Sequence, residues 1–123
     1  MSPTIENIAR KALNGAPDRW HINKADVEVF CQQEQITTSV FRKKFARYIV
    51  QGYVSGRFNW LSCDTAVNSL SAVMAWYGLM PEFPWGVFLA FDAGECHPDT
   101  PTLTPDQVTR PMIDKFISKY RIA

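Results

Sequence analysis

Apolar residues recur three and four positions apart along most of the chain, which is the spacing of one face of an α-helix. In the first half of the sequence this pattern predicts three helices, each preceded by a side chain that can cap its first turn. The expected helices run from Ser2 and Pro3 to Asn14-Gly15, from Asn23 to about Gln33, and from Thr37 or Thr38 to about Tyr53. Ala16 to His21, with Pro17 and Trp20, is expected to form a turn.

The same spacing gives the expected core positions of the first and third helices. They are Ile5, Ile8, Ala9, Ala12 and Leu13 in the first helix, and Phe41, Phe45, Tyr48, Ile49 and Gly52 in the third. Lys43, Lys44 and Arg47 fall on the opposite face of the third helix, which predicts one apolar side and one basic side. The alternation Val27-Glu28-Val29 in the second segment also suits a short strand, so both structures stay open there.

A fourth helix is predicted from Ser62, its expected cap, to Gly78 and Pro81, with Asp64 in its first turn. Residues 58 to 61 before it are expected to be a connector whose two aromatic rings dock on the core. The apolar stripe of this helix is Cys63, Val67, Leu70, Met74 and Tyr77. Its remaining polar residues are expected in solvent, and they are Asn68, Ser69 and Ser71.

The segment from Pro81 to Asp99 begins as the most apolar stretch of the sequence and ends as one of its most acidic. Its run from Val87 to Phe91 suits either a buried strand or a short buried helix. We predict a helix, because Pro84 suits a first turn, Gly94 suits a left-handed stop, and no other segment is a convincing strand. A two-stranded pairing with residues 27 to 31 or 57 to 61 stays open. This segment is expected to be the central hydrophobic element.

The last predicted helix follows a proline-rich loop over residues 97 to 103. It begins at Thr104, where Thr104-Pro105-Asp106-Gln107 has the sequence of a capping box with proline in the first turn. Pro111 predicts either a kink or a new helix that begins at Thr109. The expected core residues are Val108, Met112, Phe116, Ile117 and Tyr120. Together the segments predict an all-α, single-domain bundle of five to six helices over residues 1–123.

Composition agrees with a folded domain. The chain has 123 residues, of which 46% are hydrophobic and 20% charged, as in folded rather than disordered proteins. The three cysteines are too widely spaced for a disulfide framework or a zinc pair, and the first residues lack a secretory pattern. No apolar run approaches the ~20 residues of a membrane span. We therefore expect a cytoplasmic protein with no membrane association, metal or cofactor.

Charge is unevenly distributed along the chain, although the formal net charge is only +1. Between Gln35 and Cys63 there are five basic residues and no acidic one. Between Phe58 and Thr109 there are six acidic residues and no lysine or arginine. The two groups form separate poles if their segments lie apart, and they neutralise each other if the segments touch.

Three candidate sites follow from these side chains. Carboxylates beside an aromatic anchor suit a basic protein partner, and this first set is Glu82, Trp85, Asp92, Glu95 and Asp99. A basic helix suits phosphate groups, so the alternative nucleic-acid surface is Arg42, Lys43, Lys44 and Arg47. A thiol beside an imidazole gives the second alternative, a small enzyme that uses Cys96 and His97. Adjacent side chains on an extended chain point apart, which disfavours this pair as a nucleophile and its base.

The stretch Trp-Gly-Val-Phe-Leu-Ala-Phe-Asp-Ala-Gly-Glu at residues 85 to 95 resembles a segment of small bacterial immunity proteins. Thr-Arg-Pro-Met-Ile at residues 109 to 113 adds to this resemblance. Such proteins accompany polymorphic or contact-dependent toxins. The resemblance implies a small binding protein, not an enzyme, that neutralises a cognate toxin by covering its active site. It identifies no contact residues, and the partner-binding set above stands on its own chemistry.

Overall fold

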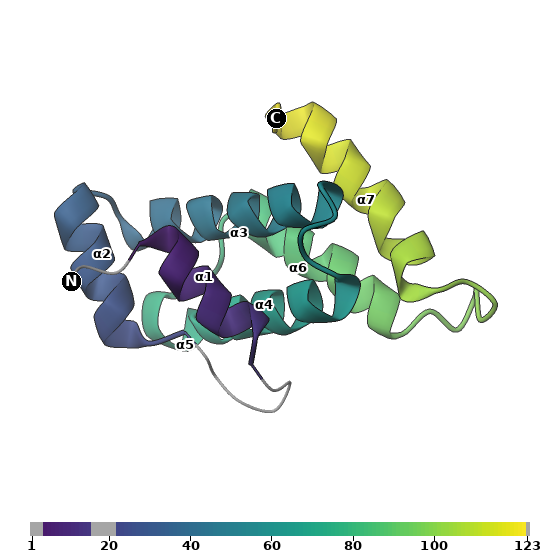
Figure 1. The fold of residues 1–123 in the computed structure, drawn as a ribbon, viewed down its shortest axis with the longest axis horizontal. Helices are drawn as coiled ribbons and strands as arrows, with labels where there is room; N and C mark the ends of the chain where they lie inside the picture. The colour runs from purple at the N-terminus through teal and green to yellow at the C-terminus, as the bar shows by residue number, and fades with distance from the viewer. Residues whose placement is uncertain (1–3, 16–21, 123) are drawn as a thin grey trace.

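Helices form the fold throughout the described residues, 4–15 and 22–122 of the computed structural model (Figure 1). In chain order they are α1 (Ile5–Leu13), α2 (Lys24–Glu34), α3 (Thr38–Val54), α4 (Trp60–Ala72), α5 (Met74–Tyr77), α6 (Glu82–Glu95) and α7 (Pro105–Tyr120). The all-α prediction is confirmed. Over the same residues there is no strand, so the alternative β pairing is not formed.

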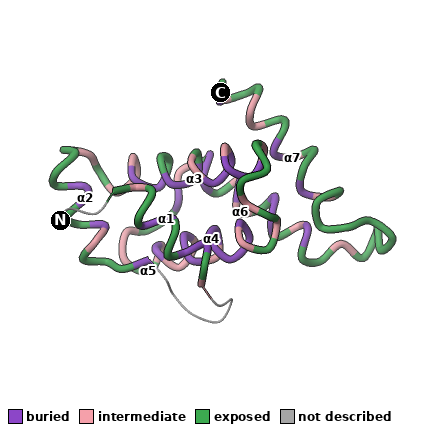
Figure 2. The backbone as a smooth tube through the Cα atoms, in the orientation of Figure 1, coloured by how far each residue is buried: buried purple, intermediate pink, exposed green. Residues whose placement is uncertain are grey.

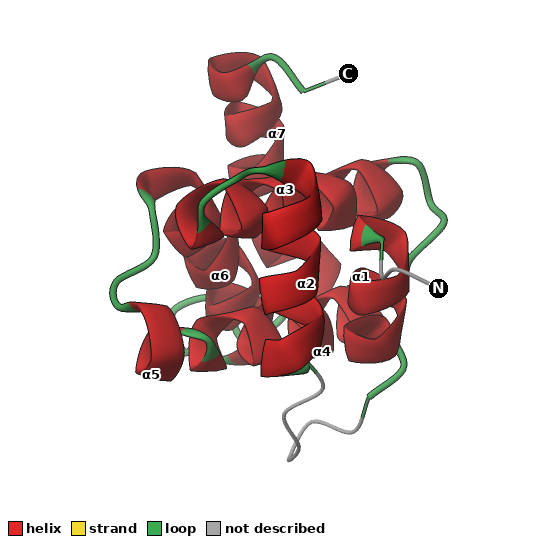
Figure 3. Ribbon diagram, turned by 90° about the vertical axis from the view of Figure 1, so that its left-hand side faces the viewer, coloured by secondary structure: helices red, strands yellow, loops and turns green. Residues whose placement is uncertain are grey.

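The helices are arranged around α3 and α4, which run side by side. Helix α1 covers one side of this pair and α6 covers the other, as the two views in Figures 1 and 3 show. Helix α2 packs against α1 and α3. Helix α7 packs against α6 and extends away from the rest of the bundle towards the C-terminus (Figure 1).

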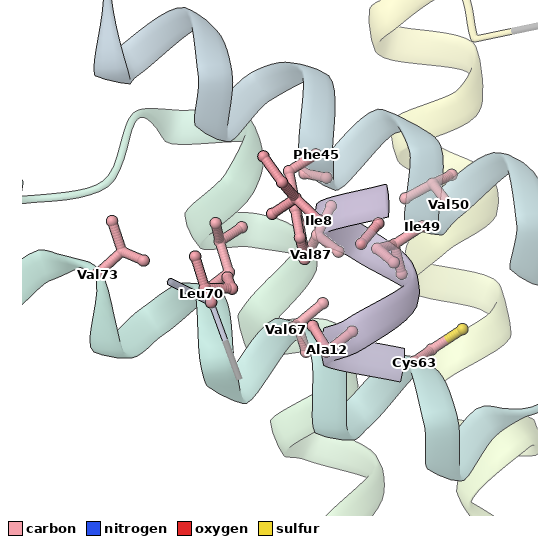
Figure 4. Close-up of a cluster of buried hydrophobic side chains, with 14 of the residues drawn as sticks. Ile8, Ala12, Phe45, Ile49, Val50, Cys63, Val67, Leu70, Val73 and Val87 are labelled. Carbon is pink, nitrogen blue, oxygen red and sulfur yellow. The ribbon is translucent and has the colours of Figure 1, made fainter. Parts of the chain in front are cut away.

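The hydrophobic core lies between these helices, and one face of α6 contributes to it. Val87, Ala90 and Phe91 of α6 are fully buried, and Val87 belongs to the same buried cluster as Ile8 and Phe45, which Figure 4 draws. The ring of Phe91 meets the ring of Tyr53 edge-on, with their centroids 5.1 Å apart. Figure 2 shows buried residues on the inner sides of α3, α4 and α6. The prediction that residues 85 to 91 form a helix with core residues is therefore confirmed.

The first turns of most helices are closed by short polar side chains, as their sequences predict. Asn23, Thr37 and Thr104 are the caps of α2, α3 and α7, and Thr104 forms a complete capping box with Gln107. The cap of α1 is Thr4. Helix α1 therefore begins later than the predicted start at Ser2 and Pro3, and those two residues lie outside the described residues. The predicted turn over residues 16 to 21 also lies outside the described residues.

Helix α4 differs from its prediction at both ends. Asn59, not Ser62, is the cap, and its Oδ1 accepts a hydrogen bond of 2.8 Å from the backbone N–H of Ser62. The second half of the expected connector, Trp60 and Leu61, is therefore helix, which places Trp60 in the first turn of α4. At the other end Val73 separates α4 from the single turn α5. Ser69, expected in solvent, is buried, and its hydroxyl is satisfied within the helix by donating to the backbone carbonyl of Thr65.

Helix α7 is continuous through Pro111 and is fixed to α6 by a buried polar contact. The indole N–H of Trp60 donates to Thr109 Oγ1 over 2.9 Å, and that hydroxyl donates to the backbone carbonyl of Ala90 over 2.8 Å. Gly94 allows this approach, because a β-carbon there would lie 2.5 Å from Thr109 Oγ1. The prediction that Gly94 ends the helix in a left-handed conformation is wrong, since it lies inside α6.

Within the described residues, no helix is both long enough and apolar enough to span a membrane.

Candidate functional site

The side of α6 that faces away from the core carries large apolar side chains in solvent. Trp85 is 39% exposed and Leu89 is 41% exposed. The ring of Phe88 stacks on that of Trp85, with their centroids 5.2 Å apart. Asp92 continues the same side at helical spacing and is exposed. We call these four residues, Trp85, Phe88, Leu89 and Asp92, the α6 outer face.

Other helices cover the remaining sides of α6. In the described structure no helix packs against the α6 outer face. Phe83 packs on the rings of Phe116 and Tyr120 from α7. Gly86 brings the backbone close to Phe116, because a β-carbon there would lie 2.7 Å from that ring. A helix that is apolar on all sides normally buries all of them. An exposed apolar strip of this kind is typical of an interaction site.

Acidic side chains from two helices meet at the C-terminal end of the α6 outer face. Asp92 and Glu95 come from α6, and Asp64 comes from α4. The side-chain amide of Asn68 donates to Glu95 Oε1 over 3.1 Å. Asp92 and Glu95 are exposed, whereas Asp64 is only 6% exposed. We call Asp64, Asp92 and Glu95 the acidic cluster.

Asp64 has an unusual environment for a carboxyl group. Its Oδ1 atom is buried and has no hydrogen-bond partner among the described residues. The pKa of Asp64 is raised to about 8, first by burial, then by a hydrogen bond with Glu95 and the charge of Glu95, and then by the charge of Asp92. The Asn68 amide acts in the opposite direction. At neutral pH Asp64 therefore keeps its proton, and it loses that proton readily if a positive charge approaches.

This arrangement suits a positively charged side chain from another molecule. A guanidinium or ammonium group can donate hydrogen bonds to several carboxylate oxygens at once. The described residues include no group of three or more His, Cys, Asp or Glu side chains arranged to hold a metal ion. The stacked rings of Trp85 and Phe88 beside the acidic cluster offer apolar area to the rest of the same partner.

The sequence-predicted contact residues fall in three places. Trp85, Asp92 and Glu95 lie in or beside the α6 outer face. Glu82 lies at the other end of α6, about 15 Å from Asp92 along the helix axis, and pairs with Lys119 over 2.8 Å. That pairing lowers the pKa of Glu82 through a hydrogen bond and the charge of Lys119. Asp99 is exposed in the loop after α6, and within the described chain no hydrogen bond or ion pair joins it to the acidic cluster.

Sequence reasoning missed Asp64, Asn68, Phe88 and Leu89 as members of this site. Asp64 and Asn68 are four residues apart and share one side of α4, next to the apolar stripe that faces the core. That spacing was a usable signal, but it does not reveal that α6 is the neighbour. Phe88 and Leu89 were assigned to the core because residues 87 to 91 are all apolar. Such a run does not show which side of the helix faces solvent.

The basic cluster of the alternative surface is divided in the structure. Lys43, Lys44 and Arg47 are exposed on α3. Arg42 is only 1% exposed and donates a hydrogen bond of 2.8 Å to the backbone carbonyl of Gly78. The prediction that Arg42 belongs to the exposed basic surface is therefore wrong. Arg42 precedes Phe45 by three residues and Ile49 by seven, so helical geometry turns it towards the core.

The Cys96 and His97 pair lies at the end of α6. The Cys96 side chain is exposed. His97 Nδ1 lies 2.7 Å from the backbone carbonyl oxygen of Thr100, a contact within its own loop. Comparisons with protein-family models, with curated proteins and with solved structures find no match to this chain.

Proposed function

We propose that this protein is a small binding protein that docks the α6 outer face and the acidic cluster on a basic surface of another protein. The observation that carries this proposal is the buried, unpartnered Oδ1 of Asp64 beside two exposed acids and an exposed aromatic strip. A cationic side chain of the partner contacts the exposed carboxylates of Asp92 and Glu95, and its charge favours the ionised form of Asp64 beneath them.

The two parts of the site have different roles in binding. Binding energy in protein interfaces concentrates in a few large side chains near the centre, and tryptophan is among the most frequent. Trp85, stacked on Phe88, is such an anchor and needs little reordering because its ring is already held. Asp92 and Glu95 add charge that speeds the encounter with a basic surface and orients it.

The acidic cluster is unfavourable for the stability of the free protein. Burial of a carboxyl group beside two other acids raises its pKa and opposes ionisation. Asp92 and Glu95 also lie in the last turn of α6, where the negative end of the helix dipole repels them. Perturbed groups of this kind concentrate at functional sites. A binding role accounts for their presence, whereas a purely structural role does not.

The partner that we propose to test first is a bacterial toxin with a basic cleft. The resemblance to immunity proteins lies in residues 85 to 95, the same segment that carries the α6 outer face. An inhibitor that blocks an active site needs a rigid scaffold and a complementary surface rather than catalytic groups of its own. The charge of the acidic cluster is complementary to a nuclease cleft, which binds phosphate groups through basic residues.

The test is calorimetric titration of the product of a neighbouring gene, or of a protein that this chain captures from the native host. The variant carries Asp92→Lys and Glu95→Lys together. We expect it to lose about a hundredfold or more in affinity, because each lysine would face a cation of the partner. Its circular dichroism spectrum should match that of the unmodified protein, since both side chains are exposed.

The matched control carries Glu28→Lys and Glu34→Lys on α2, which changes the net charge equally and lies away from α6. We expect it to keep the affinity within about threefold, because α2 lies outside the site and only long-range electrostatics change. Equal losses in the two double variants would show that net charge alone drives binding. Unchanged affinity in the α6 variant would reject the α6 outer face as the contact surface.

A further inference from the structure

A second site lies at the other end of α6, away from the acidic cluster. It is a pocket of about 680 Å³ between α3, the start of α6 and the end of α7. Its lining residues are Val40, Lys43, Lys44, Arg47, Pro81, Glu82, Phe83, Tyr120 and Ile122. Its volume lies within the range of ~300–1,000 Å³ that is typical of small-molecule sites.

The polar part of the pocket comes from one side of α3. Val40, Lys43, Lys44 and Arg47 are spaced by three, one and three residues, so all four project from the same side of that helix. Among the described residues none of the three basic side chains forms an ion pair. The one acid in the lining, Glu82, is paired with Lys119. The pocket therefore has a net positive charge.

The opposite wall is apolar and partly aromatic. The rings of Phe83 and Tyr120 lie 4.7 Å apart between centroids, and this contact joins α6 to α7. Pro81 and Ile122 extend the apolar wall. Pro81 also provides no side-chain cap for α6, so the positive end of that helix adds to the potential created by the α3 lysines.

We propose that this pocket binds a small anionic amphiphile, a molecule with one carboxylate and an acyl or aromatic body. The carboxylate lies against Lys43, Lys44 and Arg47, and the body lies on Phe83, Tyr120 and Ile122. The basic side chains favour a negatively charged ligand over a positively charged one. The apolar wall favours a ligand with an apolar body over a simple inorganic anion. Nucleic acid is less well suited, because Phe83 is buried and packs on Tyr120, so its ring is not free to stack on a base.

The experiment titrates octanoate into the 123-residue protein and follows backbone amide shifts by NMR. We expect saturable one-to-one binding, with the largest shifts in residues 40 to 47, 81 to 83 and 120 to 122. Octylammonium has the same body and the opposite charge, and acetate has the same head group and almost no body. Each is expected to bind at least about tenfold more weakly, because one lacks the charge-assisted hydrogen bonds and the other lacks the apolar contact.

Substitutions locate the site. Lys44→Glu and Arg47→Glu are each expected to weaken octanoate binding by about tenfold or more, because each replaces a cation in the lining with an acid. Lys115→Glu, on an exposed position of α7 outside the pocket, makes the same charge change and is expected to leave binding unaltered. Thermal unfolding of all three variants checks that the fold is retained.

Several results would overturn the proposal. Absence of saturable octanoate binding is one, and equal binding of octylammonium is another. Acetate that binds as tightly as octanoate would reduce the pocket to a nonspecific anion site. Shifts confined to the α6 outer face would place octanoate on exposed apolar surface instead. Displacement of octanoate by a short single-stranded RNA with steep salt dependence would identify the basic face as a nucleic-acid surface.

Discussion

Among individual residues, Asp64 is the one whose identity is least explained by core packing. Its neighbours on α4, Cys63 and Val67, are buried and apolar, and a small apolar residue would satisfy the same space. Asp64 instead brings a carboxyl group beside Glu95 and leaves one oxygen without a partner in the described structure. The physical consequence is a coupling between the proton on Asp64, the stability of the fold and the charge of any bound partner.

The first prediction concerns pH and stability. The pKa of Asp64 rises from 3.8 to about 8 on folding. The folded protein therefore holds this proton while the unfolded chain releases it, and stability falls as pH rises from about 4 to about 8. Asp64→Asn removes this titration. We expect it to raise the free energy of unfolding at pH 8 by several kcal/mol, since one pKa unit corresponds to about 1.4 kcal/mol, and to have little effect near pH 4.

Urea unfolding of the two proteins across this pH range measures the effect. The difference between their free energies of unfolding should grow steadily with pH and level off above about 8. A difference that stays constant with pH would mean that Asp64 has an ordinary pKa, and the description of the acidic cluster would then be incorrect. The affinity of Asp64→Asn for the partner should fall, because asparagine cannot provide the negative charge that a cationic partner favours.

The second prediction concerns Trp85 as an anchor. Trp85→Ala is expected to weaken partner binding by about 2 kcal/mol or more, which is the usual loss at an interface hot spot. Because Trp85 is 39% exposed, stability should fall by less than in a core substitution. Leu79→Ala is the control, since Leu79 is 89% exposed and lies outside the α6 outer face. A comparable loss in both variants, measured by calorimetry, would contradict the anchor assignment.

At the scale of helices, apolar spacing was enough to predict most of the fold. Helices α2, α3 and α7 begin at their expected caps, because a capping side chain and the apolar stripe are both local signals. The start of α4 was misplaced because both Asn59 and Ser62 are suitable caps and only tertiary packing of Trp60 decides between them. Gly94 was misread because a close approach between two helices and a left-handed turn both require glycine.

The candidate site could be predicted only in part, for a related reason. Exposed acids near an aromatic ring can be read from one segment, and this gave Trp85, Asp92 and Glu95. Asp64 joins them only because α4 and α6 are neighbours, and spacing within a helix carries no information on which helix lies beside it. Glu82 was included because it is close in sequence, but helical rise places it at the opposite end of α6.

The third prediction tests the contact between α6 and α7. Gly94→Ala is expected to destabilise the protein by about 1–3 kcal/mol, since the new β-carbon would lie 2.5 Å from Thr109 Oγ1. Thr109→Ala removes that oxygen together with its hydrogen bonds to Trp60 and Ala90. In a double-mutant cycle, the combined loss should be smaller than the sum of the single losses. Additive losses from chemical unfolding would contradict this packing.

At the scale of the whole molecule, the charges at both ends of α6 oppose its dipole. Lys43, Lys44 and Arg47 lie near its positive end, and Asp92 and Glu95 lie at its negative end. Asp92 and Glu95 therefore lie at the other end of α6 from the three bases, but Glu82 of the same acidic group lines the pocket beside those bases. The acidic and basic residues form separate poles only in part. Each pole is unfavourable for the isolated fold, which agrees with each being a binding site.

The fourth prediction follows from these poles. Replacing Asp92 by Asn and Glu95 by Gln together is expected to stabilise the protein by about 0.5–2 kcal/mol at low salt, because two charges leave the negative end of α6. The gain should decrease as salt is added, since screening weakens the same repulsion. Thermal unfolding at low and high salt measures both effects. A loss of stability in the double variant would mean that these acids hold the fold together.

The most direct test of a binding role for the acidic cluster is an NMR titration of the Asp64 carboxyl carbon, in the free protein and with its bound partner. In the free protein the midpoint should lie near the raised pKa of about 8. With a cationic side chain bound at the acidic cluster, the midpoint should fall by at least about 2 pH units, because an opposite charge favours the ionised carboxylate. The same midpoint in the free protein and in the complex would show that the partner binds elsewhere.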